Sequence, residues 1–339
     1  MAPRIDEFSH VDNYEKVEKT VPIIEAPVKK NEEIHLPIRW RNVVIFIFLH
    51  LGALYGGYLC FQAKFQTLVF AYVLYLCGAL GITAGAHRLW AHRTYKAKLP
   101  LRIVLGVFQT LALQNSIYEW SRDHRVHHKH AETNADPHNS KRGFFFSHVG
   151  WLLMKKHPDV IQKGSRIPLN DLLNDPVVAF QKKYYKFLAI TTCFVLPTII
   201  PVYFWNESWL NAYFIPAILR YVITLNFTWL TNSVAHMWGW RPYDKKIGPV
   251  ENVLVSMGAI GEGFHNFHHT FPMDYSTSEH GSVYFNFTKF FIDFMALIGQ
   301  VYDRNQVSQE QILARRKRTG DLSRMHTHTS NDDEIEHDY

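Results

Sequence analysis

The sequence predicts an all-α membrane protein, in which four transmembrane helices carry a cytosolic helical domain that caps them and holds a di-metal site. Three observations predict this architecture. The chain contains four apolar runs of membrane-spanning length, basic residues gather on one side of these runs, and histidines form three clusters on that same side. A composition of 47% hydrophobic and 19% charged residues fits a membrane part joined to a sizeable aqueous part.

The two ends of the chain have the composition of flexible segments. Residues 1–38 are charged, contain prolines and show no regular apolar pattern. The first apolar run begins near Val43, which is too far along the chain for a cleaved secretory signal. Residues 306–339 combine a basic run with an acidic end and are predicted to form a flexible tail. The transmembrane and cytosolic parts are therefore expected within residues 39–305.

Four apolar runs are each close to the roughly 20 residues that a helix needs to cross the hydrocarbon core. They cover about residues 43–60, 67–86, 187–205 and 209–230. Prolines in the last two runs would kink the helices, which membrane helices tolerate. A weaker apolar stretch, residues 99–118, is expected to form a helix at the membrane surface or in the protein interior.

The loops between these runs differ in charge, and this difference predicts the orientation. The two short loops hold Lys64 as their only basic residue, whereas Lys and Arg residues such as Arg39, Arg93 and Lys186 flank the spans on the other side. Under the positive-inside rule, both termini and the long segment 86–186 lie in the cytosol. The net charge of +6 comes without a basic repeat, so no nucleic-acid partner is indicated.

Twenty histidines are many for this length, and eight of them form the motifs HRLWAH, DHRVHH and HNFHH. The eight are His87, His92, His124, His127, His128, His265, His268 and His269. Spacings of three and four residues place side chains on one face of a helix. The spacing of five between His87 and His92 fits one face less well, so a local bend or a different side-chain reach is expected there. His236, at the cytosolic end of the fourth span, is a ninth candidate, with a satisfied core histidine as the alternative.

Neutral imidazole is a good ligand for zinc, iron, copper and nickel. Zinc sites use three or four protein ligands, so eight or nine histidines suit two ions. The three cysteines, Cys60, Cys77 and Cys193, lie in apolar runs and indicate neither a disulfide framework nor a cysteine metal site. A histidine-rich metal transporter would place its binding residues inside the spans. Here the main ionisable residues within the spans are His50 and Arg220, which disfavours a transporter.

The longer motifs around the histidines resemble those of the membrane-bound acyl-CoA desaturases of the animal stearoyl-CoA type. These motifs are GITAGAHRLWAH, QNSIYEWSRDHRVHHKHAETNADPHNSKRGFFFSHVGWLL, NSVAH and GEGFHNFHHTFP. The resemblance extends from about Trp40 to Arg304. It implies that the nine histidines hold two iron ions and that Asn232 holds a water beside one of them. An inter-helix hydrogen bond is the alternative role of Asn232.

The resemblance also implies an acyl-CoA site. The matching coenzyme A contacts are Asn42, Asn115, Arg122, Asp123, Lys155, Lys156 and Trp229. The acyl chain would lie in a bent tunnel, with Gln114, Trp120 and Thr228 at the bend and Tyr75 and Ala79 at the closed end. Cations with spare donors suit the phosphates of coenzyme A. The lysine pair can also be read as a solvated or lipid-facing surface.

The implied reaction inserts a cis double bond, delta-9 as the family default, into saturated C16–C18 acyl-CoA in the endoplasmic reticulum membrane. Dioxygen is the co-substrate, because no acid or base side chain ionises an unactivated C–H bond and a redox metal is required. Beyond acyl-CoA and membrane lipid, the implied partners are cytochrome b5 and its NADH-dependent reductase, because no haem-binding module is recognisable in the sequence. A hydroxylase with the same histidine motifs and a zinc-dependent membrane amidase are the alternatives.

Overall fold

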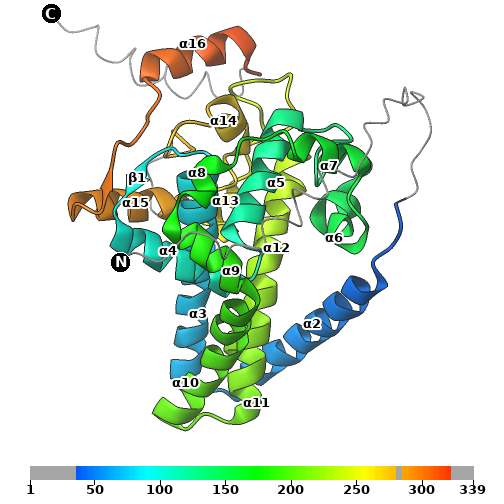
Figure 1. Ribbon diagram of the computed structural model, residues 1–339, viewed down its shortest axis with the longest axis vertical. Helices are drawn as coiled ribbons and strands as arrows, with labels where there is room; N and C mark the ends of the chain where they lie inside the picture. Colours follow the sequence, from blue (N-terminus) through cyan, green and yellow to red (C-terminus); the bar gives the residue numbers. More distant parts are fainter. Residues whose placement is uncertain (1–35, 280–284, 322–339) are drawn as a thin grey trace, which may run out of the picture. The chain divides into compact units, whose positions relative to one another are not determined.

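The computed structural model of the protein describes residues 36–279 and 285–321 (Figure 1). Most of the N-terminal segment predicted to be flexible, and residues 322–339 of the predicted tail, lie outside the described residues. The described part is mostly helical. Its named strands are β1 (Lys96–Ala97) and β2 (Val301–Tyr302), which pair antiparallel.

Four apolar helices are long enough to cross a membrane, which confirms the four predicted spans and a multi-pass membrane protein. They cover Trp40–Leu59, Phe65–Ala91, Pro176–Trp205 and Trp209–His236. The third helix starts at Pro176, well before the predicted start at residue 187, because its first turns carry the basic sequence QKKYYK, which an apolar pattern misses. Asp175 caps this start by accepting a hydrogen bond from Val177 N at 2.9 Å.

Wide π-helical turns interrupt three of the four spans. The elements along the four spans are α2 (Trp40–Leu59); α3 (Phe65–Leu80) and η1 (Gly81–Ala91); α9 (Pro176–Ile190), η4 (Thr191–Val195) and α10 (Leu196–Trp205); and α11 (Trp209–Ala212), η5 (Tyr213–Leu219), α12 (Arg220–Asn232) and η6 (Val234–His236). Proline lacks the N–H that the helix needs and crowds the preceding turn. Pro216 lies within η5 and Pro197 is the second residue after η4, so two of the wide turns lie at or next to prolines.

The side chain of Arg220 provides hydrogen bonds to backbone carbonyls of these interrupted helices within the membrane region. The side chain is only 2% exposed. It donates to Pro216 O at 2.9 Å, to Cys193 O at 2.9 Å and to Leu111 O at 3.0 Å. Pro197 has no N–H to bond the carbonyl of Cys193 four residues earlier, and Leu111 lies in the last turn of its helix, where carbonyls lack intrahelical partners. The buried arginine therefore satisfies carbonyls that helix interruptions leave free.

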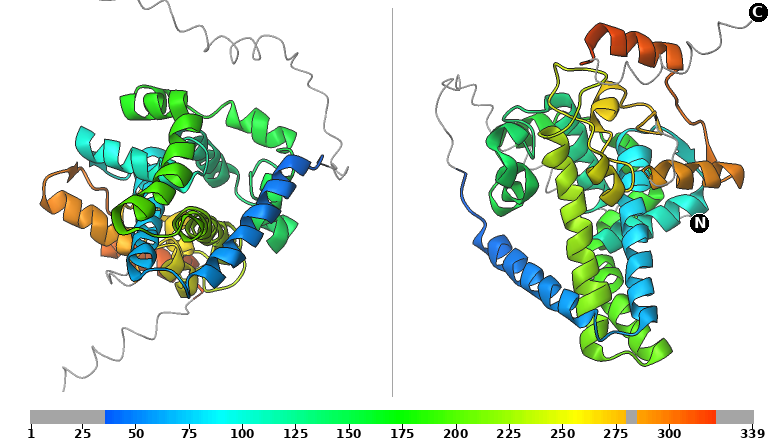
Figure 2. Two further views of the ribbon diagram at one scale, coloured as in Figure 1. Left: turned by 90° about the horizontal axis from the view of Figure 1, so that it is seen from below. Right: turned by 180° about the vertical axis from the view of Figure 1, so that it is seen from behind.

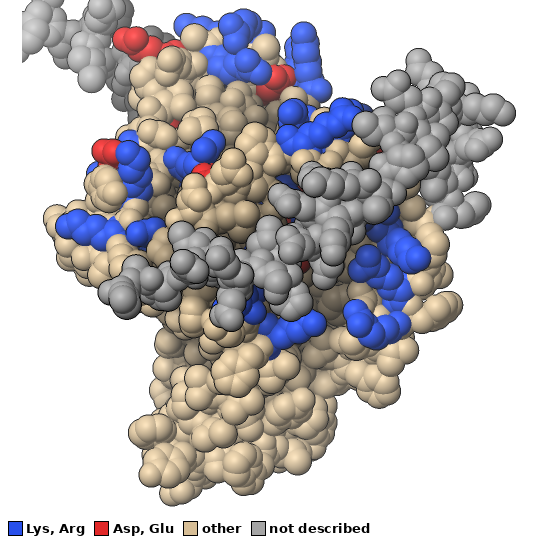
Figure 3. All heavy atoms as spheres, viewed as in Figure 1, with Lys and Arg blue, Asp and Glu red and all other residues tan. Residues whose placement is uncertain are grey.

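The remaining helices form a layer over one end of the spans, here called the histidine end (Figures 1 and 2). They are α4 (Leu99–Ala112), α5 (Ile117–His130), η2 (Ser140–Arg142), η3 (Phe146–Gly150), α6 (Trp151–Leu153), α7 (Pro158–Gly164), α8 (Asn170–Leu173), α13 (Val253–Gly258), α14 (His265–Thr270), α15 (Phe287–Leu297) and α16 (Gln309–Thr319). Lys and Arg surround this layer, whereas the lower part of the face shown in Figure 3 is without charged side chains. This division fits a membrane around the lower part.

Helix α4 (Leu99–Ala112) forms within residues 99–118, where the sequence predicts a helix at the membrane surface or in the protein interior. Its apolar side chains Ile103, Val104 and Val107 are exposed, while Leu105 is fully buried. The helix packs against η1 at Gly81, where an added Cβ would lie 2.1 Å from the backbone N of Gln109. Glycine therefore permits the close approach of these two helices.

The prediction of a flexible tail from residue 306 is wrong for residues 309–319, which form α16. A capping box of Ser308 and Gln311 starts the helix. Ile312 is 2% exposed. Arg316 is only 6% exposed, and its buried guanidinium group pairs with Glu279. The run of basic residues suggested a solvated tail, but the periodicity of the helix turns one arginine inward.

Candidate metal centre

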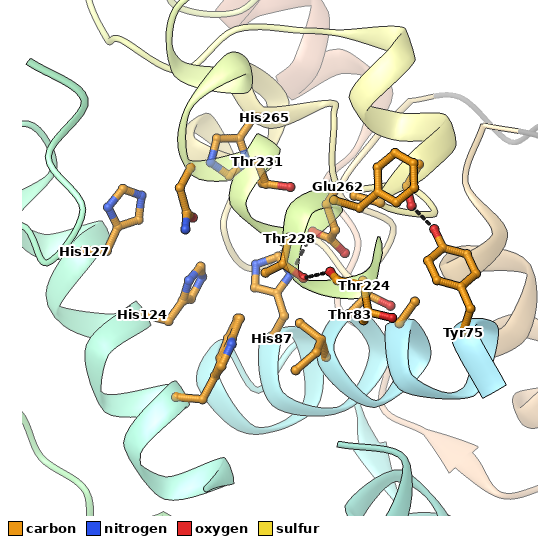
Figure 4. A pocket seen from close by; sticks show the side chains of 17 residues that line it. Tyr75, Thr83, His87, His124, His127, Thr224, Thr228, Thr231, Glu262 and His265 are labelled. Carbon is orange, nitrogen blue, oxygen red and sulfur yellow. Dashed lines mark hydrogen bonds and ion pairs between the residues drawn. The ribbon is translucent and has the colours of Figure 1, made fainter. Parts of the chain in front are cut away.

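The structure brings all nine predicted histidines together at the histidine end of the spans. The first group is His87, His92, His124, His128 and His268. The second group is His127, His236, His265 and His269. Within each group the candidate ligand atoms lie within 4.8 Å of one another. Figure 4 shows how His87 of η1, His124 and His127 of α5, and His265 of α14 approach one another.

The π-helical turn of η1 explains the spacing of five between His87 and His92. His92 N donates to His87 O at 3.0 Å, which is an i to i+5 bond. In such a wide turn, residues five apart lie above one another. The two imidazole rings are therefore 4.9 Å apart, and both serve the first group.

Helix α5 supplies histidines to both groups and is fixed to η1 from its other face. His124 and His128 belong to the first group and His127 to the second. Between them, Arg125 donates to Ala91 O at 3.0 Å and to Trp90 O at 2.8 Å. These bonds join the first two histidine motifs independently of any metal.

The nitrogen atoms of the two groups fit metal ions. The closest Nε2–Nε2 distances are 2.8–3.0 Å in the first group and 3.1–3.3 Å in the second. A neutral imidazole has one N–H, so converging ring nitrogens cannot all donate to one another. Burial, followed by the neighbouring histidines, lowers the pKa of His124, His128 and His268 well below the usual value. These rings are neutral at pH 7, which is the form that binds metal.

Two cavities with shared walls adjoin the histidines. The narrow cavity extends from His87, His124 and His265 to Tyr75, at opposite sides of Figure 4. The larger cavity, of about 620 Å³, is lined by charged and polar residues together with apolar ones, and residues of α2 form part of its wall. Trp120, His124, Thr228 and Asn232 line both.

The residues expected along an acyl tunnel lie around these two cavities. Tyr75, Ala79, Trp120 and Thr228 line the narrow cavity. Gln114 lines the larger one and donates to Thr228 Oγ1 at 2.9 Å. The neighbours of Gln114 adopt left-handed backbone conformations, with φ of 47° at Leu113 and 67° at Asn115. Such strain persists only where the surroundings hold it, and here it turns the chain sharply between α4 and α5.

The expected coenzyme A contacts divide into two sets. Those that line the larger cavity are Asn42, Asn115, Arg122, Asp123, Lys156 and Trp229. Lys156 and Arg122 both pair with Asp123. Lys155 is exposed, and among the described residues it is not part of this cavity wall.

Comparison with known proteins gives the family. The model of the family described as Fatty acid desaturase matches residues 63–284. The chain belongs to the fatty acid desaturase family. An Acyl-CoA Delta-9 desaturase of Acheta domesticus is 59% identical over 296 residues, which cover 87% of this chain and 82% of the relative. Stearoyl-CoA desaturase 5 of Bos taurus is 60% identical over 286 residues, covering 84% and 85%. Stearoyl-CoA desaturase of Homo sapiens is 57% identical over 297 residues, covering 88% and 81%.

In this member of the desaturase family, two carboxylates orient histidines and were missed by the sequence analysis. Glu262 Oε2 lies 2.8 Å from His87 Nδ1, and its other oxygen pairs with Arg88. Burial alone would raise the pKa of Glu262, but the charges of His87 and Arg88 and their hydrogen bonds lower it to about 2. Asp136 Oδ1 lies 2.9 Å from His127 Nδ1. A carboxylate on Nδ1 directs Nε2 toward a metal; the only sequence signal was an acidic residue close to a histidine motif.

His138, which belongs to none of the three histidine motifs, lies beside the two histidine groups. Its ring is 4.3 Å from that of His127, and it forms a third metal-capable group with His127 and Asp136. Burial, followed by the charge of His127, lowers its pKa to about 3. His50, by contrast, lies outside both groups; it accepts a hydrogen bond from Asn226 Nδ2 at 3.2 Å and so joins the first and fourth spans.

Proposed function

We propose that the protein is an O2-dependent fatty acyl-CoA desaturase that inserts a cis double bond, at delta-9, into saturated C16–C18 acyl-CoA. The observation that carries this proposal is the position of two adjoining histidine groups at the junction of a large cavity, whose wall holds several charged residues, and a narrow one. The names of the relatives support the substrate class and the position of the double bond.

The proposed cofactor is a pair of iron ions. His87, His92, His124, His128 and His268 would hold one, and His127, His236, His265 and His269 the other. Asn232, in the wall of both cavities, would hold a water beside one of the two ions. When bound, the iron pair supplies the redox chemistry with O2 that removes two hydrogens from an unactivated pair of methylene groups. A ligand set of nitrogen atoms without cysteine suits iron.

The chain's own residues bind and orient the substrate. Arg122 and Lys156 line the larger cavity with spare donors for the phosphates of coenzyme A. Asp123 pairs with both and holds these two cations side by side. The acyl chain would continue past Trp120 into the narrow cavity, whose apolar walls exclude water from the reacting carbons.

Selectivity for one carbon pair follows from a fixed length. The coenzyme A moiety anchors the chain at one end, and the corner at Gln114 and Thr228 bends it at a set distance. Tyr75 lies at the far end of the narrow cavity, where its hydroxyl donates to Gly258 O. Because this hydrogen bond fixes its position, the Tyr75 side chain is suited to close the cavity behind the methyl end of the acyl chain.

The proposed location is the endoplasmic reticulum membrane, with both termini and the histidine end in the cytosol. The basic residues around the histidine end support this orientation through the positive-inside rule. Electrons would come from cytochrome b5 and its NADH-dependent reductase.

The test is turnover by the purified protein with stearoyl-CoA, O2, NADH, cytochrome b5 and its reductase, with products located by mass spectrometry. We expect two irons per chain and oleoyl-CoA as product. A hydroxylated product would favour the hydroxylase, and bound zinc with hydrolysis would favour the amidase; either result contradicts the proposal.

A further inference from the structure

Helix α14 carries three of the nine histidines on only six residues. His268 belongs to the first group and His265 and His269 to the second, so this helix supplies both. A helix this short is unstable by itself in water. Its neighbours must therefore hold the three imidazoles in place.

The two residues between these histidines anchor the helix from its opposite side. Asn266 Oδ1 accepts from Tyr243 N at 2.9 Å and from Asp244 N at 3.1 Å. Its Nδ2 donates to Asp244 O at 2.9 Å and to Pro249 O at 3.0 Å. Phe267 is 1% exposed, and its ring centroid is 5.1 Å from that of Tyr243. The chain segment 241–249 is thus the support of α14.

Helix α16 in turn holds this segment. Ile312 forms one apolar cluster with Tyr243 and Phe267. Thr319 bonds the segment twice: its Oγ1 donates to Tyr243 O at 2.6 Å, and its carbonyl accepts from Lys245 N at 2.9 Å. The views in Figures 1 and 2 show α16 lying over α14 on the side away from the spans.

Ion pairs add to this attachment. Arg315 pairs with Asp244, one of the residues that bond Asn266. Arg316 pairs with Glu279, which also accepts from the hydroxyl of Tyr243. Since Arg316 is 6% exposed, its ion pair is shielded from solvent.

We propose that α16 is a positioning strap that sets how tightly the protein retains both metal ions. The inference rests on the proposed metal role of the histidines and not on the substrate. Ile312 packs in one cluster with Phe267 and Tyr243 and acts through them on His265, His268 and His269. Removing it leaves space behind α14, so the three imidazoles lose their fixed direction toward the ions.

The experiment compares iron release from the full-length, iron-loaded protein in detergent. A ferrous chelator is added, and the coloured complex is followed for the wild type, Ile312→Ala and the neighbouring control Leu313→Ala, whose side chain is 45% exposed. We expect release from Ile312→Ala about tenfold faster than from the wild type, the size of effect seen when a support of a ligand is lost. Leu313→Ala should match the wild type, and Ile312→Val should recover most of the retention.

Thermal melting of the metal-free forms separates this role from general destabilisation. The cavity left by Ile312→Ala also lowers overall stability, so release is measured well below the melting temperature of the metal-free variant; faster iron release under these conditions supports the strap. Arg316→Gln, which keeps the apolar cluster, should also release iron faster. Wild-type release rates in both variants overturn the strap while the metal proposal stands. A wild type that binds no iron overturns the proposed function, and the strap with it.

Discussion

Both ends of the four spans bury polar side chains, but the two ends differ in whether those groups are satisfied. At the far end, Glu207 is 6% exposed and accepts hydrogen bonds from Lys64 N, Thr67 Oγ1, Ser208 N and Asn211 Nδ2 at 2.5–3.0 Å. At the histidine end, ring nitrogens converge on one another.

The difference shows which buried polar groups are structural and which await a ligand. Glu207 has the donors that a buried carboxylate needs, and all of them come from the N-cap residues and first turns of α3 and α11. The converging Nε2 atoms face one another and do not have enough N–H groups to satisfy them all. Within the described residues, Nδ1 of His265 and of His268 also has no hydrogen-bond partner. A cation bound between the Nε2 atoms would satisfy their lone pairs. Satisfied groups at one end close the fold, and unsatisfied groups at the other end form the site.

The strongest test of this contrast removes one converging imidazole. His128→Ala should abolish desaturation and lower the iron content, because His128 belongs to the first group and stacks 4.1 Å from His269 of the second. The protein should still insert into the membrane, since no span changes. Product analysis and metal analysis on membrane-extracted protein check this. Near-full activity in the variant would mean that the histidine groups are not the active site.

A second test compares a carboxylate from each end. Glu262→Gln removes the charge that fixes His87 through Nδ1, so iron affinity should fall about 10- to 100-fold. Glu207→Gln is the matched control at the far end, and it should leave iron affinity unchanged. Competition with a chelator of known affinity measures both variants. Equal affinities of Glu262→Gln and the wild type would show that Glu262 is structural like Glu207.

The same contrast explains what could be predicted from the sequence. Four spans and three histidine motifs follow from apolar length and from residue spacing, which are local properties. Eight of the nine histidines were predicted because they repeat at short spacings, whereas His236 was predicted from its place at the end of the fourth span and from the family resemblance. Glu262 and Asp136 were missed because each acts on one nitrogen of a histidine distant in the chain or across a turn, and a single acidic residue has no pattern.

Two other features depend on contacts that the sequence does not display. The inward turn of Arg316 depends on Glu279, far from it in sequence, so a run of basic residues looked solvated. The role of Arg220 depends on the carbonyls of Cys193 and Leu111, which are distant in sequence and accept hydrogen bonds from its side chain. Both are tertiary effects that override local composition.

The far end can be tested by stability. Glu207→Gln should lower the free energy of unfolding by about 1–3 kcal/mol, because at least one of the buried donors loses its charged acceptor. Burial alone would raise the pKa of Glu207, but hydrogen bonds from Thr67 and from backbone N–H groups lower it. A lowered pKa gives stability that is present above the unfolded value of about 4.3 and is lost as pH falls through the folded value. The difference between variant and wild type, measured by melting in detergent, should therefore shrink below about pH 4. A difference independent of pH would contradict this ionic role.

The smallest expected effect concerns a side chain that is neither fully satisfied like Glu207 nor unsatisfied like the histidines. Lys156 has one ion-pair partner and further N–H groups that can bind a ligand. Lys156 pairs with Asp123 in the wall of the larger cavity, whereas its neighbour Lys155 is exposed outside that wall. Lys156→Ala should raise KM for stearoyl-CoA about threefold, the scale of a partly solvated ion pair, with little change in kcat. Lys155→Ala should leave both constants unchanged. Initial rates at varied acyl-CoA concentration distinguish the two, and a larger effect from Lys155 would place the phosphates of coenzyme A on the outer surface instead of in the cavity.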